Sequence, residues 1–378
     1  MLDRRRFLGT LAVAAGSLPL LGKAAAAAKD PAGSLYARSL VIDAQSAPGE
    51  FLPDAPADAA LSSKAVADAR ASGVTACIVN VGQVGNSPLK FEQAVARIAS
   101  CERDIADHPE VFRSVRTFRD LEALKASGQM GFIYGFQDTS MLAGDLSRLT
   151  LFHNLGVMVV QPTYNLRNLA GDGCLETSDG GLSLFGHQFV AEMNRLHMLL
   201  DLSHGSARTI ADGIAASRSP MAISHTGCRA LADVPRNTSD ENLRALAQKG
   251  GVAGIYFMPF LRTSGQPHAE DVIRHLDHAV NVCGEDHVGL GTDGVISGVT
   301  IDDKLRAWQQ AFYASRVKDG LAAPGEAADT FDLVPEYNDP RRLETLANDL
   351  GRFGWRAGRI EKILGANFAR LFKEVWSA

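Results

Sequence analysis

Short apolar runs alternate with longer amphipathic segments along most of this chain. Many of the runs are rich in Val and Ile, and they end at Gly, Pro, Ser or Asp. Short apolar runs that are bounded by turn residues and separated by helix-length segments are typical of buried parallel strands. Eight such runs occupy residues 39–43, 74–81, 131–136, 157–161, 198–204, 220–225, 251–256 and 288–293. The pattern predicts an α/β fold, a single (β/α)₈ TIM-like barrel.

The segments between the runs carry the spacing of surface helices, for example at 91–107, 189–197 and 240–248. An open doubly wound sheet is the alternative, but no glycine-rich dinucleotide fingerprint follows the first run. Residues 300–340 contain Pro324, Pro335 and Pro340 and predict a loop-rich excursion at the rim of the barrel. Residues 344–376 predict terminal helices packed on the outside of the barrel.

Three of the predicted strands end on side chains that carry chemistry. The fifth ends Ser203-His204, the sixth ends Ser224-His225, and the eighth ends at Asp293. In a barrel of parallel strands, functional side chains gather at the carboxyl ends of the strands. A single histidine there is often only a hydrogen-bonded rim residue. Two Ser-His endings with a carboxylate favour a metal or acid/base site.

Composition and charge narrow the class of protein. The 378 residues are 46% hydrophobic and 21% charged, which is ordinary for a soluble globular enzyme. The formal net charge is -5, and removal of residues 1–28, with four basic residues and one acidic residue, would leave -8. Such a charge argues against a nucleic-acid partner. The five cysteines are widely scattered, which gives no metal-ligand spacing and predicts mostly core thiols.

The amino terminus has the pattern of an export signal. Arg4-Arg5-Arg6-Phe7-Leu8 fits the twin-arginine motif, and a mostly apolar stretch over residues 8–21 precedes alanines 24–28. We expect cleavage after Ala26 or Ala28, because small residues there permit signal-peptidase cleavage. The alternative, a membrane anchor, is disfavoured because the apolar stretch is too short to span a membrane comfortably. The expected organisation is a signal peptide at 1–28 and a barrel domain at 29–378. The mature protein is then periplasmic or secreted, with no stable membrane anchor.

From about residue 36 onward the chain resembles the membrane (renal) dipeptidases, a family of zinc-dependent peptidases with an amidohydrolase-like barrel. The resemblance rests on fragments whose order and spacing together are specific. They are Gly181-Leu182 with Phe185-Gly186, residues 192–196, Asp201-Leu202-Ser203-His204, Ser224-His225, Arg236-Asn237, residues 284–293 and residues 363–368.

The resemblance also implies a role for individual residues. His204 and His225 match the two imidazole ligands of the family's second metal site, and Asp293 matches its catalytic acidic residue. Arg236 matches the arginine that binds a substrate carboxylate, although without the match it would be interpreted as a solvated loop residue. Tyr164 stands where the family often has an oxyanion-stabilising histidine, and its hydroxyl can both donate there and contact substrate.

The chain departs from the family at the first metal site. Gln45 and Ala47 stand where the family has a His-x-Asp pair, and Gln137 replaces a glutamate that bridges two metals. A neutral amide is a poor bridge between two dications, so Gln137 offers at most a weak oxygen ligand. Asp43 lies just before the altered pair and Asp138 just after Gln137, but side chains alternate along a strand, so we expect that a rescue needs a bulge or bend. We therefore expect one zinc ion at most, and an alternative with none.

These residues favour a hydrolase of a dipeptide or similar small amide with a free carboxylate. One alternative is a catalytically weak or inactive relative that binds a carboxylate-bearing ligand on the same barrel. Another is the tailoring of a secreted peptide metabolite. The expected partner is a small molecule or dipeptide, and a homodimer is compatible with the sequence.

Overall fold

The computed structural model describes residues 31–51, 59–84 and 89–377, and residues Ala32–Ala378 group into one compact unit. The predicted export signal at 1–28 lies outside the described residues. Within the described part of the chain, no helix is both long enough and apolar enough to cross a membrane.

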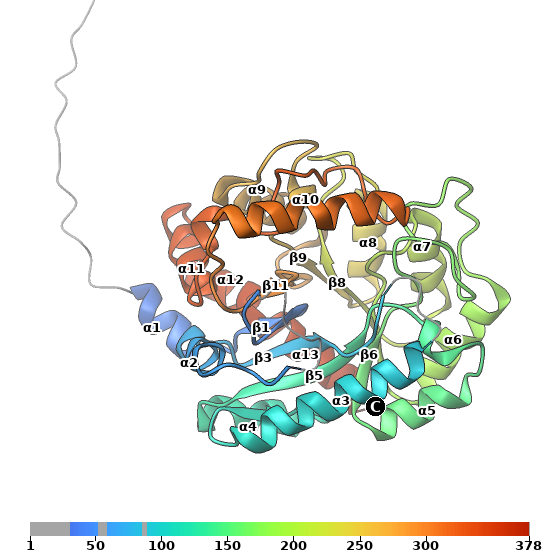
Figure 1. Ribbon diagram of the computed structural model, residues 1–378, viewed down its shortest axis with the longest axis horizontal. Coiled ribbons are helices and arrows are strands. Elements are labelled where there is room, and N and C mark those ends of the chain that lie inside the picture. The colour runs from blue at the N-terminus through green and yellow to red at the C-terminus, as the bar shows by residue number, and fades with distance from the viewer. Residues whose placement is uncertain (1–30, 52–58, 85–88, 378) are drawn as a thin grey trace, which may run out of the picture. The chain divides into compact units, whose positions relative to one another are not determined.

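Parallel strands form the centre of this unit, with helices around them (Figure 1). One sheet has the order β1-β3-β5-β6-β7, with β4 beside β5, and a second has the order β10-β9-β8. The eight strands that form the barrel coincide with the eight predicted runs. They are β1 (Ile42–Asp43), β3 (Ala76–Asn80), β5 (Met130–Phe136), β6 (Val157–Val160), β7 (Leu199–Leu200), β8 (Ala222–Thr226), β9 (Val252–Ile255) and β10 (Val288–Leu290).

Hydrogen bonds join the two sheets at both of their free edges. A parallel bridge pairs Asp201 with Ala222, next to β7 and β8, and Leu202 N donates to Ala222 O at 2.8 Å. At the other edge, Ala44 N donates to Leu290 O at 2.9 Å. The curled parallel sheet confirms the predicted α/β barrel class and rules out the open-sheet alternative. Three short strands stand outside the ring, β2 (Ser46–Ala47), β4 (Phe112–Ser114) and β11 (Gly294–Val295).

Alternation along the strands divides the core into two layers. Ile42, Ala76 and Ile78 face one hydrophobic cluster, whereas Cys77 and Val79 face the other. Successive side chains of a strand point to opposite faces, so one cluster fills the barrel and the other lies beneath the surrounding helices. Strands buried on both faces explain why the runs are continuously apolar.

The helices cover most of the remaining chain, and the one predicted at 240–248 has the predicted bounds. Its cap is Ser239, whose hydroxyl accepts from Asn242 N. The helix predicted at 189–197 is α6, which begins five residues earlier at Leu184, because Ser183 caps it. The α-helices are α1 (Pro31–Arg38), α2 (Ser63–Ser72), α3 (Lys90–Asp107), α4 (Phe118–Ser127), α5 (Ser147–Asn154), α6 (Leu184–Arg195), α7 (Ala207–Ala216), α8 (Asp240–Gln248), α9 (Ala269–Cys283), α10 (Asp303–Lys318), α11 (Arg342–Arg352), α12 (Ala357–Glu361) and α13 (Asn367–Trp376).

The terminal helix α13 corrects one prediction. Phe368 and Phe372 belong to the same cluster as Ile42, Ala76 and Val252 on the inward faces of the strands. A Cβ added at Gly289 of β10 would lie 2.5 Å from the Phe368 ring. Helix α13 therefore closes the end of the barrel opposite the strands' carboxyl ends, and the prediction that it packs outside was wrong.

Residues 300–340, which were predicted as a loop-rich segment at the rim, contain a helix. Helix α10 runs for 16 residues, and of these only Leu305 and Gln309 are buried. All five cysteines are free thiols, as predicted for core residues, with only Cys283 partly exposed.

Candidate metal centre and substrate cavity

The carboxyl ends of the barrel strands bring the predicted site residues together. His225 lies within β8, while His204 and Asp293 follow β7 and β10. His204 and Asp293 both have left-handed backbone, with φ of 65° and 60°. Residues other than glycine adopt this conformation rarely, and it is concentrated at functional sites. Tight turns at these two positions direct the side chains into the mouth of the barrel.

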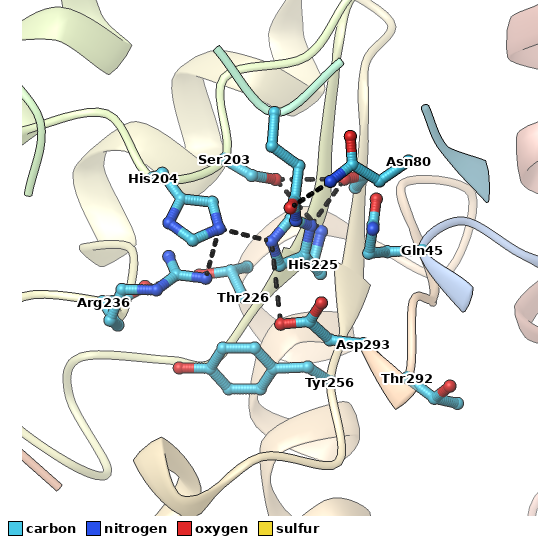
Figure 2. A network of polar contacts seen from close by, with 12 residues as sticks. Gln45, Asn80, Ser203, His204, His225, Thr226, Arg236, Tyr256, Thr292 and Asp293 are labelled. Carbon is cyan, nitrogen blue, oxygen red and sulfur yellow. Dashed lines mark hydrogen bonds and ion pairs between the residues drawn. The ribbon is translucent and has the colours of Figure 1, made fainter. Parts of the chain in front are cut away.

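The two imidazoles face each other through their Nε2 atoms, which are 2.9 Å apart (Figure 2). His204 Nδ1 lies 2.7 Å from Asn165 Oδ1, a pure acceptor, so Nδ1 carries the proton. Arg236 Nη2 donates to His204 Nε2 at 3.2 Å, which requires a lone pair on that nitrogen. His204 therefore presents an unprotonated Nε2 to its neighbour.

A buried carboxylate sets the tautomer of the second imidazole. Ser224 Oγ donates its only proton to Asp201 Oδ2 at 2.5 Å, so His225 Nδ1 donates to Ser224 Oγ at 2.8 Å. Asp201 also accepts from Ser203 Oγ at 2.8 Å and from Gln161 Nε2 at 2.7 Å. Sequence reasoning missed this role for Asp201, although it lies in the quoted Asp-Leu-Ser-His fragment.

These contacts leave both His204 and His225 with a lone pair on Nε2, and a metal at this place would replace the hydrogen bond that Arg236 donates to His204. Burial, with the charge of Arg236, lowers the pKa of both histidines well below the usual range, so neither is a cation. Two nitrogen lone pairs 2.9 Å apart repel each other unless a cation lies between them. Zinc binds imidazole nitrogen at about 2.0–2.1 Å, so one ion can contact both atoms. The pair fits a single zinc ion.

Asp293 lies beside this pair, with Oδ2 3.9 Å from His225 Nε2. Burial raises the pKa of Asp293 to about 7, while the charge of Arg236 opposes that rise. A bound dication would lower this pKa again. The described residues nevertheless contain no group of three His, Cys, Asp or Glu side chains arranged to hold a metal.

Arg236 is buried and not a solvated loop residue. It is 4% exposed, and its guanidinium lies over the rings of Tyr256 and Phe260 at 5.8 and 5.6 Å. Among the described residues, no carboxylate lies within 4.0 Å of it. A buried guanidinium without an anion is costly, and its planar fork is suited to a carboxylate supplied by a ligand.

Tyr164 also lies at the site, with its ring stacked on the His204 ring at 4.1 Å and 30°. It lines a cavity of about 150 Å³ together with Arg236, Asp293 and Arg316. Burial raises the pKa of Tyr164, so its hydroxyl stays protonated and can donate a hydrogen bond. Arg316 forms an ion pair with Glu326 through two hydrogen bonds, at 2.5 and 2.8 Å. The sequence analysis did not identify Arg316, because it lies on α10, where a loop was predicted.

The remaining predicted ligand, Gln137, accepts a hydrogen bond from Asn80 Nδ2 at 3.0 Å. The two nearby carboxylates do not replace the missing ligands. Asp43 accepts from Thr292 N and Oγ1, both at 2.7 Å, and Asp138 accepts from Ser140 and pairs with Lys90 at 3.3 Å. Both carboxylates are thus engaged by these neighbours and not by the histidines.

This barrel carries paired imidazoles, an adjacent carboxylate and a buried arginine at its mouth, an arrangement typical of metal-dependent hydrolases of the amidohydrolase type. The family model described as membrane dipeptidase (peptidase family M19) matches residues 57–303. The chain belongs to this family of zinc-dependent metallopeptidases, as its resemblance implies.

The chain is also similar to individual curated proteins. A Claviceps purpurea protein named dipeptidase tcpJ is 36% identical over 266 residues, which are 68% of this chain and 53% of that protein. A Klebsiella pneumoniae protein, named only as uncharacterised, is 27% identical over 68% of this chain and 86% of its own length. The chain thus spans about half the length of the matched relatives that are named dipeptidases.

A solved structure described as an amidohydrolase from Pseudomonas aeruginosa has the same fold. It is 29% identical, with a TM-score of 0.78 over 92% of this chain and 99% of that one.

Proposed function

We propose that this protein hydrolyses a dipeptide or similar small amide that carries a free carboxylate, with one zinc ion held by His204 and His225. The observation that carries the proposal is the pair of Nε2 lone pairs 2.9 Å apart, beside a carboxylate and an unpaired buried guanidinium. When bound, zinc supplies Lewis-acid activation of water and of the scissile carbonyl.

Three side chains of the protein would supply substrate binding, proton transfer and oxyanion stabilisation. Arg236 binds the carboxylate of the substrate and so fixes its direction in the cavity. Asp293 accepts the proton of the attacking water and returns it to the leaving amine, a role that its position, with Oδ2 3.9 Å from His225 Nε2, supports. The Tyr164 hydroxyl donates to the oxygen that becomes negative in the tetrahedral intermediate.

Only one ion is proposed, because Gln45, Ala47 and Gln137 provide no anionic ligand for a second. Loss of the second ion is expected to reduce the rate, since two metals normally share the nucleophile. The lack of a third strong ligand in the described residues favours one alternative, a carboxylate-binding protein with little catalysis.

The test is hydrolysis of small amides by purified mature protein, with and without zinc. We expect turnover that requires zinc and is lost in His204→Ala. His187→Ala is the matched control, because His187 is exposed on α6. Absence of zinc-dependent turnover in the unmodified protein would refute the hydrolase and leave the binding-protein alternative.

We also propose export to the periplasm by the twin-arginine pathway, on the motif at Arg4-Arg5-Arg6. Replacement of Arg4 and Arg5 by lysine should leave the precursor in the cytoplasm. Normal export of that variant would refute this proposal.

A further inference from the structure

Two cavities adjoin at the carboxylates of Asp293 and Asp332. The cavity of about 150 Å³, which we call the arginine cavity, is lined by both of these residues together with Arg236 and Tyr164. A second cavity of about 210 Å³ is also lined by both, but not by Arg236, Tyr164 or His204. The second cavity therefore extends the candidate site on the side of Asp293 and Asp332.

The second cavity has mostly apolar walls, and we call it the apolar cavity. Arg342 also lines it, but its guanidinium donates to the carbonyl oxygens of Asp339 and Ile296, at 3.0 and 2.7 Å. A mostly apolar cavity takes a hydrophobic side chain, because burial of apolar surface is favourable. The apolar lining includes Phe51, Phe257, Val295, Val299, Leu333 and Val334.

Asp332 borders both cavities and has no partner for its charge. Its side chain makes no hydrogen bond or ion pair with any residue in the described ranges 31–51, 59–84 and 89–377. Its backbone, in contrast, is held on both sides by the carboxamide of Gln266, which accepts from Phe331 N at 2.9 Å and donates to Leu333 O at 2.5 Å. An unpaired carboxylate on a fixed backbone is suited to a cation that a ligand supplies.

The other carboxylates of the arginine cavity leave this role to Asp332. Glu326 accepts two hydrogen bonds from Arg316. Asp293 is proposed to transfer a proton, and an ammonium group bound to it would block that transfer. Among the described residues, Arg236 is then the unpaired cation of the cavity and Asp332 its unpaired anion, so the site fits a zwitterionic ligand.

The order of these groups fixes the direction of a bound dipeptide. Figure 2 shows Arg236 and Thr292 on opposite sides of Asp293, and Thr292 lines the apolar cavity. A substrate carboxylate at Arg236 and a scissile carbonyl at the histidines leave the amino-terminal residue on the side of the apolar cavity. The ammonium of that residue is carried by the carbon next to the carbonyl, so it reaches the boundary where Asp332 lies.

We propose that Asp332 binds the free ammonium group of the substrate, a dipeptide whose bulky apolar amino-terminal side chain occupies the apolar cavity. The inference rests on the proposed hydrolase function and adds a specificity-determining residue to it. Asp332 lies outside residues 57–303, which the dipeptidase family model matches, so the match assigns it no role. Water adds to the carbonyl, the C–N bond breaks, and the amine leaves with a proton, which gives two free amino acids.

The test uses two compounds that differ only in the ammonium group, phenylalanylleucine and hydrocinnamoylleucine, each with leucine in both enantiomers. Leucine suits the apolar side chains of Met258, Phe260 and Phe312 that line the arginine cavity. We expect kcat/KM for phenylalanylleucine to exceed that for hydrocinnamoylleucine by at least about tenfold, because its ammonium gains a charge-assisted hydrogen bond. Equal or faster hydrolysis of hydrocinnamoylleucine would overturn the inference while leaving the proposed hydrolase intact.

Substitution of Asp332 gives a second measurement. Asp332→Asn keeps the shape of the side chain but removes its charge, and it should reduce the ratio of the two kcat/KM values about tenfold. Asp329→Asn removes the same charge from an exposed position on the same segment, lines neither cavity, and should leave the ratio unchanged. An unchanged ratio in Asp332→Asn, with native circular dichroism, would also overturn the inference.

Alanylleucine tests the assignment of the apolar cavity. Its kcat/KM should be at least about tenfold lower than that of phenylalanylleucine, because a methyl group leaves most of the apolar wall in contact with water. Equal values for the two dipeptides would overturn the part of the inference that concerns the apolar cavity.

Calorimetric affinities for metal-free protein decide the case in which no compound is hydrolysed and the proposed hydrolase fails. Tighter binding of phenylalanylleucine than of hydrocinnamoylleucine, with the difference lost in Asp332→Asn, then supports the ammonium site. Equal affinities, or a preference that survives in Asp332→Asn, contradict it.

Discussion

Arg236→Met should change ligand affinity and protein stability in opposite directions. The guanidinium is 4% exposed, contacts His204 Nε2 at 3.2 Å, and has no carboxylate within 4.0 Å in the described part of the chain. A ligand carboxylate bound there gains charge-assisted hydrogen bonds in a water-poor site, and loss of one such partner costs about 3 kcal/mol. At about 1.4 kcal/mol per tenfold, carboxylate ligands should bind roughly 150-fold more weakly.

The same substitution removes an unpaired buried charge from the empty protein. Methionine fills similar volume and packs on the rings of Tyr256 and Phe260, so the free energy of unfolding should rise by about 1 kcal/mol. Such a trade of stability for binding is expected at a functional site but not at a structural arginine.

The assay compares N-acetylleucine with N-acetylleucinamide by calorimetry on metal-free protein, and urea denaturation measures stability. Arg229→Ala, on the same loop and paired with Asp233 at 3.1 Å, is the control for loop disturbance. Equal loss of affinity for both ligands, or a lower stability of Arg236→Met, would show that Arg236 supports the loop and does not bind substrate.

Three further substitutions test residues that orient the metal ligands or stabilise the fold. Asp201→Asn should weaken zinc binding about 10- to 100-fold in a competition titration, because it removes the carboxylate oxygen that orients Ser224 and, through it, His225. An unchanged zinc affinity would contradict the argument for the His225 tautomer. Burial lowers the pKa of His275 to about 4. The contribution of neutral His275 to the free energy of unfolding is therefore complete above the unfolded-state pKa of about 6.5, and about 3 kcal/mol of it is lost as the pH falls towards 4. His275→Gln, which can keep the bonds to Cys228 N and Leu261 O, should flatten that pH dependence of unfolding, and an unaltered profile would refute the assignment. Phe368→Ala should lower the free energy of unfolding by about 3–5 kcal/mol in a denaturant titration, because the Phe368 ring packs inside the barrel next to Gly289. A loss of under about 1 kcal/mol would mean that α13 is not part of the core.

The strand pattern was the part of the fold most open to prediction, because strands buried on both faces give continuous apolar runs. The place of α13 was not predictable in the same way. Its apolar face shows that it packs on something, but periodicity does not distinguish the outside of the barrel from its closed end. Helix α10 gave no signal at all, since it buries only Leu305 and Gln309 and so has no apolar stripe.

The residues of the candidate site were likewise only partly predictable from the sequence. His204, His225 and Asp293 were predictable because each ends a strand, where the barrel directs function. Asp201 orients His225 through Ser224, which lies 23 residues from it along the chain, and Arg316 lies in a segment that was predicted as a loop. Such contacts depend on tertiary packing, which local sequence patterns do not encode.

Counting metal ions in the purified mature protein tests the central claim most directly. The paired lone pairs of His204 and His225, with neutral residues at 45, 47 and 137, predict one zinc per chain by elemental analysis, lost in His204→Ala. The combined variant Gln45→His, Ala47→Asp and Gln137→Glu should raise the count toward two. Two ions in the unmodified protein, or none after incubation with zinc, would contradict the account.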